Sequence, residues 1–209
     1  MRQYRTALLV IDLQNDFTQP WGSVYREPTG EMMDRVSKSI DIMREKGVLV
    51  VIVYSGGPAE ARKATGEFRP SRTHRADGVR RCLIEGTPGA EIDERIHIDR
   101  QRDILWHKHA PSAFFQNDLA ERLRAFGVEN VLVCGVKTNV CCRATVNDAF
   151  SHGFTTFAVS DMLATNTPEL NAFFIEDMAK YFATAVTSDE AFRLLEEGKL
   201  QKEIHMKVI

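Results

Sequence analysis

Cys141 is the residue whose type and position most clearly allow chemistry. The apolar run Val131–Cys134 suits a strand buried on both faces of a parallel sheet, and Gly135 ends it. Apolar residues then recur at helical spacing as far as Phe150, which predicts a helix that begins near Asn139. In the first turn of that helix, unpaired backbone N–H groups and the helix dipole favour a thiolate over a thiol. The spacing therefore allows a nucleophilic cysteine.

The alternative is that the cysteines of this segment are ordinary small residues of the core. Free cysteines are among the most buried residue types. Cys134 lies inside the predicted strand and Cys142 lies on the apolar stripe of the predicted helix, so we expect both to be structural. Cys141 lies about 100° around the helix from Cys142 and off that stripe. Position alone leaves a catalytic and a structural role for Cys141 equally open.

Two ionisable residues also follow predicted strands. Asp12 follows the apolar run Ala7–Ile11, where an aspartate ordinarily caps the next turn. Lys108 ends the alternating segment Asp103–Lys108. Because the carboxyl ends of parallel strands share one edge of a sheet, we expect Asp12 and Lys108 to lie near Cys141.

The strands and helices alternate along the whole chain. Further strands are predicted at Val48–Tyr54 and Thr155–Ser160, and a short last strand at Ala183–Thr187. Thr167 and Pro168 have the residue types of a helix N-cap and its first position. Right-handed crossovers then give an α/β fold with a parallel sheet covered by helices on both faces.

Composition excludes several classes of protein. The 209 residues, 44% of them hydrophobic, suit a single domain spanning 1–209. A net charge of −2 provides no general attraction for nucleic acid or anionic membranes, and no apolar stretch approaches the ~20 residues of a membrane span. The four cysteines form neither a disulfide framework nor a zinc pattern. We therefore expect a cytoplasmic protein with reduced thiols.

Loop residues supply the candidates for substrate binding. Phe17 and Trp21 lie in a loop after the first strand, where aromatics either line a pocket or cover the core. The long segment between residues 55 and 102 is rich in arginine, which forms either a solvated face or an anion-binding site. His107 and His109 share one face of their strand, but a third ligand is missing, so we predict no metal site. The arginines considered for substrate binding are Arg72, Arg75, Arg80 and Arg81.

Three motifs resemble those of the isochorismatase-like cysteine hydrolases. They are LLVIDLQNDF around Asp12, KHAPSAFFQNDL beginning at Lys108, and GVKTNVCCRATVNDA around Cys141. The family includes N-carbamoylsarcosine and ureidoacrylate amidohydrolases, and the resemblance runs from about Thr6 to Leu195. It implies a Rossmann-like, doubly wound sheet of about six parallel strands and a catalytic triad of Asp12, Lys108 and Cys141.

The resemblance also implies details of the site. The backbone N–H groups of Lys137 and Cys141 would form an oxyanion hole, after a cis peptide bond between Val136 and Lys137. The Lys108 ammonium would lower the pKa of the thiol by a unit or more, and Asp12 would shuttle the proton. No cofactor is implied, and self-association as a homo-oligomer (a dimer or a tetramer) is expected by analogy.

Two departures from the family pattern narrow the activity. Lys137 stands where relatives commonly have a small residue, and residues 54–57 (YSGG) lack the Asp-x-His element of the zinc-binding nicotinamidases. We expect cleavage of a C–N bond in a small carboxamide or ureido compound through a thioester. Vinyl ether hydrolysis, as in isochorismatases, and a non-catalytic binding role are the alternatives. A carboxylate on the substrate would suit the arginines, with Phe17, Trp21 and Phe114 as apolar walls.

Overall fold

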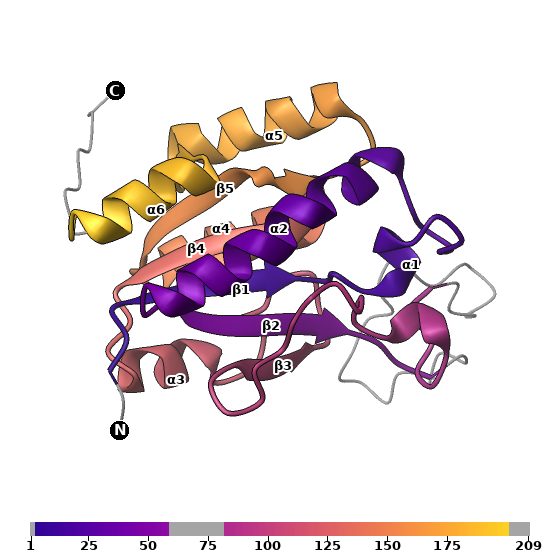
Figure 1. Ribbon diagram of the computed structural model, residues 1–209, viewed down its shortest axis with the longest axis horizontal. Coiled ribbons are helices and arrows are strands. Elements are labelled where there is room, and N and C mark those ends of the chain that lie inside the picture. Colours follow the sequence, from indigo (N-terminus) through magenta and orange to yellow (C-terminus); the bar gives the residue numbers. More distant parts are fainter. Residues whose placement is uncertain (1–2, 59–81, 201–209) are drawn as a thin grey trace.

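The computed structural model describes residues 3–58 and 82–200. Its centre is a sheet of six parallel strands in the order β3-β2-β1-β4-β5-β6 (Figure 1). The strands are β1 (Thr6–Ile11), β2 (Leu49–Ser55), β3 (Ile104–Lys108), β4 (Asn130–Val136), β5 (Thr155–Ala164) and β6 (Thr184–Val186). The predicted α/β fold with about six parallel strands is therefore confirmed.

The order of the strands reverses between β1 and β4. From β1 the chain proceeds outward through β2 to β3, and from β4 it proceeds outward in the other direction through β5 to β6. In sheets of this kind the crevice outside the carboxyl ends of the strands at the reversal is the usual ligand site. Asp12 follows β1 and Cys141 lies just beyond β4, so both lie at that crevice.

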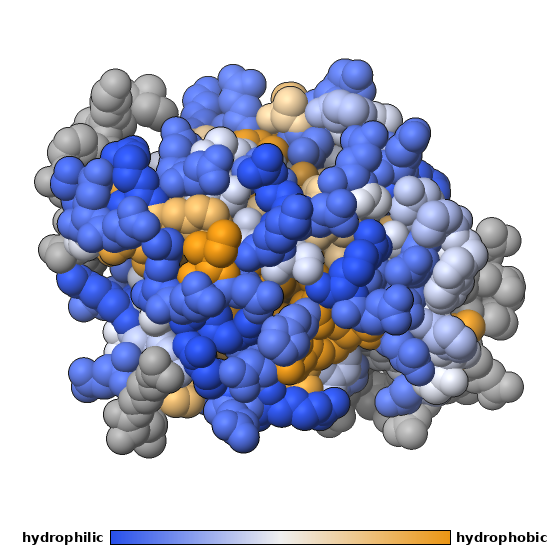
Figure 2. All heavy atoms as spheres, viewed as in Figure 1, coloured by the Kyte–Doolittle hydropathy of each residue, from blue (hydrophilic) through white to orange (hydrophobic). Residues whose placement is uncertain are grey.

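Helices cover both faces of the sheet, as Figure 1 shows. Helices α2 (Glu27–Glu45) and α6 (Ser188–Glu196) pack on one face, and α3 (Leu119–Ala125), α4 (Arg143–Ser151) and α5 (Pro168–Tyr181) pack on the other. Two short helical turns, α1 (Asn15–Thr18) and η1 (Pro88–Ala90), lie against each other beyond β1. The face carrying α2 is mostly hydrophilic, with apolar atoms visible between the polar side chains (Figure 2).

Local sequence explains the ends of several helices. Thr167 caps α5 by accepting a hydrogen bond from the backbone N–H of Leu170, and Pro168 opens that helix as predicted. At α6, Thr187 and Glu190 form a reciprocal capping box. Gly47 follows the last residues of α2 and has a φ of +80°, the left-handed conformation that commonly ends a helix.

Two elements differ from their predicted limits. β5 continues through Asp161 to Ala164, because its register with β4 shifts between Val133 and Gly135 and pairing then resumes. The helix predicted to begin near Asn139 is preceded by a π-helical turn, Thr138–Cys142, and α4 itself begins at Arg143. Cys141 therefore lies in the π turn rather than in the first turn of the α-helix.

None of the described helices is both long and apolar enough to span a membrane.

Gly135 lets β4 approach β1 at the crevice. A Cβ atom built at Gly135 would lie 2.1 Å from the carbonyl oxygen of Ile11, and the φ of Gly135 is +112°. Any other residue would both clash with the backbone of β1 and occupy a conformation that L-residues disfavour. The close approach brings the ends of β1 and β4 together, so this glycine sets the spacing between Asp12 and the cysteine turn.

We predict that Gly135→Ala destabilises the fold far more than Gly153→Ala. Gly153 also has a positive φ, of +83°, but nothing lies within 4 Å of a Cβ there, so Gly153→Ala should cost only about 1–2 kcal/mol. Gly135→Ala adds a backbone clash and should cost at least about 3 kcal/mol or prevent folding. Urea unfolding of both variants measures the difference. Equal losses would show that the approach of β4 to β1 is not a tight constraint.

Candidate active site

Asp12, Lys108 and Cys141 meet at the carboxyl edge of the sheet. Lys108 Nζ lies 2.9 Å from Asp12 Oδ2 and 3.5 Å from Cys141 Sγ. Nζ also donates a hydrogen bond to the carbonyl oxygen of Ala110 at 3.2 Å. The side chains of Lys108 and Asp12 are 2% and 1% exposed, whereas Cys141 is partly exposed. An acid, an ammonium and a thiol thus share one largely dry site, with the sulfur on its open side.

The strand order explains how Lys108 reaches Asp12. β3 is the edge strand, and β2 separates it from β1. Lys108 pairs in register with Ser55, the last residue of β2, so its side chain crosses the end of β2 to reach Asp12. The hydroxyl of Ser55 lies on the same route and donates to Asp12 Oδ1 at 3.0 Å. Each oxygen of the Asp12 carboxylate therefore faces a different donor group.

Asp12 itself is held in an uncommon backbone conformation. Its φ is +53°, and its N–H donates to the carbonyl oxygen of Val53 in β2. Aspartate tolerates the left-handed region better than most residues do. This turn directs the carboxylate of Asp12 toward Lys108 at the carboxyl ends of the strands. The carboxylate therefore does not cap the following loop.

Gln14 is a buried residue whose role the sequence analysis missed. Its side-chain amide donates to the carbonyl oxygens of Ser55 and Ala90, and its oxygen accepts from the N–H of Ser55. Gln14 thereby fixes the backbone of the residue whose hydroxyl holds Asp12. The only sequence signal was its place two residues after Asp12 in LQNDF, where a glutamine after a buried strand needs backbone partners.

Two buried carboxylates anchor the loops around the site. Asp16 accepts hydrogen bonds from the N–H and hydroxyl of Ser23 and from the N–H of Leu83. Asp93 is fully buried and accepts from Thr18 and Arg95. These contacts join α1 to the segment around η1, which lies far from it in the sequence.

The cysteine turn is fixed by backbone and side-chain bonds on both sides. The N–H groups of Val140 and Cys142 donate to the carbonyl oxygen of Lys137. The peptide bond between Val136 and Lys137 is cis, as the resemblance implied. The hydroxyl of Thr138 donates to the side chain of Asn171 in α5, so the turn is also tied to the face that carries α5.

The ionisation of the triad differs from the sequence expectation in one respect. Burial disfavours the Lys108 ammonium, but the neighbouring Asp12 outweighs it and the pKa of Lys108 is raised. Burial, followed by the charge of Asp12, raises the pKa of the Cys141 thiol to about 12, against the lowering effect of Lys108. The predicted lowering of the thiol pKa is therefore wrong, because burial and the charge of Asp12 together outweigh the lowering effect of Lys108.

Residues 6–190 match the isochorismatase domain. The chain belongs to the isochorismatase family. It is 33% identical over 179 residues to a probable inactive nicotinamidase of Arabidopsis thaliana, covering 85% of this chain and 89% of the relative. It is 27% identical over 199 residues to the maleamate amidohydrolase of Pseudomonas putida, covering 91% and 87%. A cysteine hydrolase from Pseudomonas syringae pv. phaseolicola 1448A superposes with a TM-score of 0.80 at 25% identity, covering 92% and 93%.

The residues predicted to bind substrate in this isochorismatase-family chain do not lie together in the structure. Phe17 is buried in α1, with Lys137 Nζ 5.7 Å from the centre of its ring. Trp21 lies in the loop after α1 and is 60% exposed. Phe114 is not brought to the site: it is buried in the core, where its ring packs against Phe154 at the start of β5. The four arginines considered for substrate binding, Arg72, Arg75, Arg80 and Arg81, lie outside the described residues.

The histidines near Lys108 form a ring cluster rather than a metal site. The ring of His107 lies 4.6 Å from that of His109 and 5.0 Å from that of Tyr54, measured between centroids. Burial, followed by the charge of His109, lowers the pKa of His107. Within residues 3–58 and 82–200, no group of three or more His, Cys, Asp or Glu side chains is arranged to hold a metal ion.

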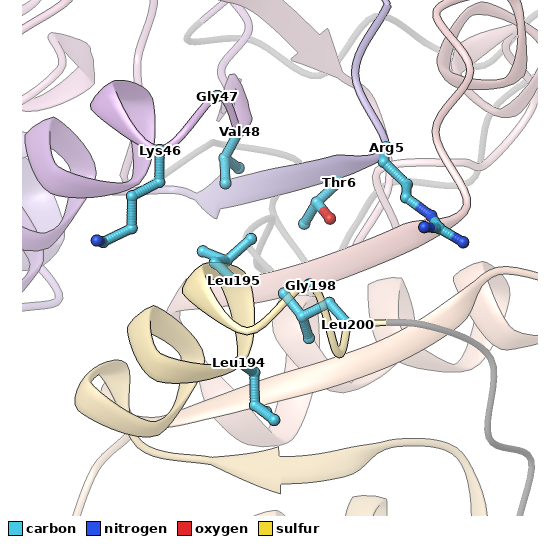
Figure 3. Close-up of a pocket in the computed structure, with 9 residues that line it drawn as sticks. All are labelled: Arg5, Thr6, Lys46, Gly47, Val48, Leu194, Leu195, Gly198 and Leu200. Carbon is cyan, nitrogen blue, oxygen red and sulfur yellow. The ribbon is translucent and has the colours of Figure 1, made fainter.

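A cavity of about 190 Å³ lies at the amino ends of β1 and β2, on the side of the sheet away from Cys141 (Figure 3). Figure 3 shows Arg5 and Lys46 on opposite sides of it, with Leu195 between them. Each cation is paired with an acid, Glu129 and Glu196 respectively. The six residues of β1 separate this cavity from the triad by roughly 20 Å, so it does not take part in the chemistry of the triad.

We predict that Cys141 reacts slowly with iodoacetamide at pH 7 and that its rate rises about tenfold per pH unit up to pH 9. The reason is that the thiolate is the reactive form and the thiol pKa is raised to about 12. Asp12→Asn removes the negative charge and should increase the rate at pH 7. Mass spectrometry of tryptic peptides measures labelling at each cysteine, with buried Cys134 as the internal control. A rate already independent of pH near 7 would contradict the protonated resting state.

Proposed function

We propose that this isochorismatase-family hydrolase cleaves a C–N bond of a small carboxamide or ureido compound through a thioester on Cys141. The observation that supports it best is the direct contact of Lys108 with both Asp12 and Cys141 at the switch point of the sheet. The three side chains supply a proton acceptor, a fixed positive charge and a nucleophile, which are the groups that acyl transfer requires.

In the first half of the reaction the sulfur forms a bond to the carbonyl carbon. The thiol proton passes to the Asp12 carboxylate as Cys141 Sγ attacks, because the resting thiol is protonated and faces that carboxylate. The backbone N–H groups of Lys137 and Cys141 are the proposed donors to the oxyanion. The C–N bond then breaks, Asp12 returns its proton to the leaving nitrogen, and ammonia or an amine departs.

The second half releases the acid and restores the thiol. A water molecule gives a proton to Asp12 and attacks the thioester carbonyl, and the C–S bond breaks. The proton on Asp12 then returns to the sulfur, so the enzyme ends in its starting state. Asp12 serves as base and acid in turn, which requires a carboxylate within reach of both the sulfur and the leaving group.

Lys108 stabilises charge while that proton is in transit. Once Asp12 is protonated it no longer neutralises the ammonium, and the full positive charge then faces a sulfur 3.5 Å away. At an effective dielectric near 20 such a pair is worth about 4 kcal/mol before desolvation. The thiolate is therefore stabilised at the moment it forms and not in the resting enzyme.

The relatives support an amide as the substrate class. The maleamate amidohydrolase and the amidohydrolases named for ureidoacrylate cleave C–N bonds, as their names state. The retained cysteine disfavours the vinyl ether alternative, which needs no sulfur nucleophile. Because a relative at 33% identity is described as probably inactive, ammonia release from a panel of small amides and ureides is the decisive assay.

We predict that Cys141→Ala abolishes ammonia release and that Asp12→Asn and Lys108→Met each reduce kcat/KM by at least about 10³-fold. Both Asp12 and Lys108 take part in the same proton and acyl transfer. The double variant Asp12→Asn with Lys108→Met should therefore lose little more kcat/KM than either single variant. Cys134→Ala, which changes a buried cysteine inside β4, is the control and should keep nearly full activity. Turnover by Cys141→Ala would refute the covalent route.

The chain is also proposed to form a homo-oligomer. Three aromatic side chains on α4 and α5 are half or more exposed: Phe150, Phe173 and Tyr181 at 51%, 61% and 50%. Phe150 and Tyr181 each contact Phe182, so these three rings form one connected surface, and Phe173 packs against Phe174 farther along α5. Exposed apolar patches of this kind are typical of protein interfaces.

We predict that the wild-type chain elutes as a dimer or tetramer and that Phe150→Ser with Tyr181→Ser shifts it toward monomer. The substitutions remove apolar area from the patch without touching the triad. Size-exclusion chromatography with light scattering measures the mass. Trp21→Ser removes an exposed aromatic outside the patch and is the control. A wild-type monomer at micromolar concentration would contradict the proposal.

A further inference from the structure

Lys137 is a half-buried lysine whose side chain joins two connections, one after α1 and one after β5. It follows β4 directly and lies four residues before Cys141. Its Nζ donates to the carbonyl oxygen of Val24, in the connection from α1 to α2, at 3.3 Å. Nζ also donates to Asn166 Oδ1, in the connection from β5 to α5, at 3.1 Å, and lies 5.7 Å from the centre of the Phe17 ring. The ammonium is therefore held at the same edge of the sheet as the nucleophile.

The charge of Lys137 has no acidic counterpart among the described side chains. Both acceptors that the described residues provide are neutral, and an ammonium has three donors, so one donor has no acceptor within residues 3–58 and 82–200. Arg44 and Lys108, the two most deeply buried cations described, each pair with a carboxylate, Asp103 and Asp12 respectively. Burial, followed by the charge of nearby Arg26, lowers the pKa of Lys137 to about 8. A partly buried cation without an anion is costly, unless an anion arrives from outside.

We infer that Lys137 determines specificity by receiving the carboxylate of an amide or ureido substrate that also carries an acid group. This inference rests on the proposed hydrolysis at Cys141. The backbone of Lys137 borders the proposed oxyanion site, and its side chain reaches Phe17, which follows the strand that carries Asp12. A small bifunctional molecule would place its carbonyl at the sulfur and its carboxylate at the ammonium. The substrate then supplies an anion for Lys137 that the described side chains do not supply.

A purely structural role makes a different prediction. If Lys137 only joins the Val24 and Asn166 loops, then replacing it should impair every substrate equally. If Lys137 binds a carboxylate, then its replacement should lower kcat/KM more for acid-bearing substrates than for neutral ones. Neutral and acidic amides of the same size therefore distinguish the two roles.

The experiment compares succinamate, an acid-amide, with succinamide, its neutral counterpart. Ammonia release gives kcat and KM for both compounds in wild type, Lys137→Met and Lys137→Arg. We expect Lys137→Met to lower kcat/KM for succinamate by about 10- to 100-fold, chiefly through KM, because hydrogen bonds to charged groups contribute that much. The loss of kcat/KM for succinamide should be at least fivefold smaller than the loss for succinamate, and Lys137→Arg should keep a preference for succinamate.

The matched control is Lys180→Met. Lys180 Nζ lies 5.2 Å from the centre of the Tyr181 ring, so this variant removes another lysine stacked on an aromatic ring, outside the site. Both compounds should be unaffected by it. Equal losses for the two compounds in Lys137→Met, or no loss for either, would overturn the inference. A succinamate preference that survives in Lys137→Met but disappears in Arg72→Ala, Arg75→Ala, Arg80→Ala or Arg81→Ala would place the anchor elsewhere.

A binding measurement separates this inference from the proposed function. Calorimetry with succinate, the dicarboxylate itself, requires no turnover and is done on Cys141→Ala and on Cys141→Ala with Lys137→Met. We expect binding in the first and at least tenfold weaker binding in the second. If wild type releases no ammonia from any amide yet this difference is found, then the reaction is wrong and the anion site stands. Equal affinities would overturn the anion site whatever the activity.

Discussion

The buried ion pair between Lys108 and Asp12 is the interaction on which the rest of the site depends. Taking two charges out of water is expensive, and a pair of this kind is retained only where its geometry and its further hydrogen bonds are good. Here Ser55 and Ala110 supply those further bonds. The loss of either charged partner would leave the other buried and unpaired. The pair therefore links the end of β1 to the end of β3 across the full width of β2.

The supporting residues act on the backbone rather than on the substrate. Gln14 fixes Ser55 through two hydrogen bonds, and Gly135 allows β4 to lie close against Ile11. Far from the site, Arg44 on α2 pairs with Asp103, which precedes β3, and so positions the strand that ends in Lys108. The positions of Asp12, Lys108 and Cys141 are thus set by strand register and by buried polar contacts at other residues.

Sequence alone was sufficient for the fold because the signals are local and repeated. Apolar runs marked β1 and β4, and Thr167 and Pro168 marked the start of α5. The proximity of Asp12, Lys108 and Cys141 was expected because the carboxyl ends of parallel strands lie together, and their assignment as a catalytic triad came from the family resemblance. The roles of Gln14 and Asp16 were not predicted, since each depends on partners 40 or more residues away in the sequence. Phe114 was misplaced for a related reason: nothing local shows that the loop after β3 turns its ring into the core.

The ionisation of Cys141 was the least predictable property, because it depends on burial and on the opposing charges of two neighbours. Burial and Asp12 raise the pKa of the thiol, and together they outweigh the lowering effect of Lys108. Lys108 and Asp12 form an ion pair, and in the proposed reaction this pairing changes when the thiol proton moves to the carboxylate. Lys137 shows the opposite arrangement, with a cation at the same edge and no acid beside it among the described residues. The paired cation suits the reacting atoms, where charge appears only in passing, and the unpaired cation suits a ligand group that is charged throughout.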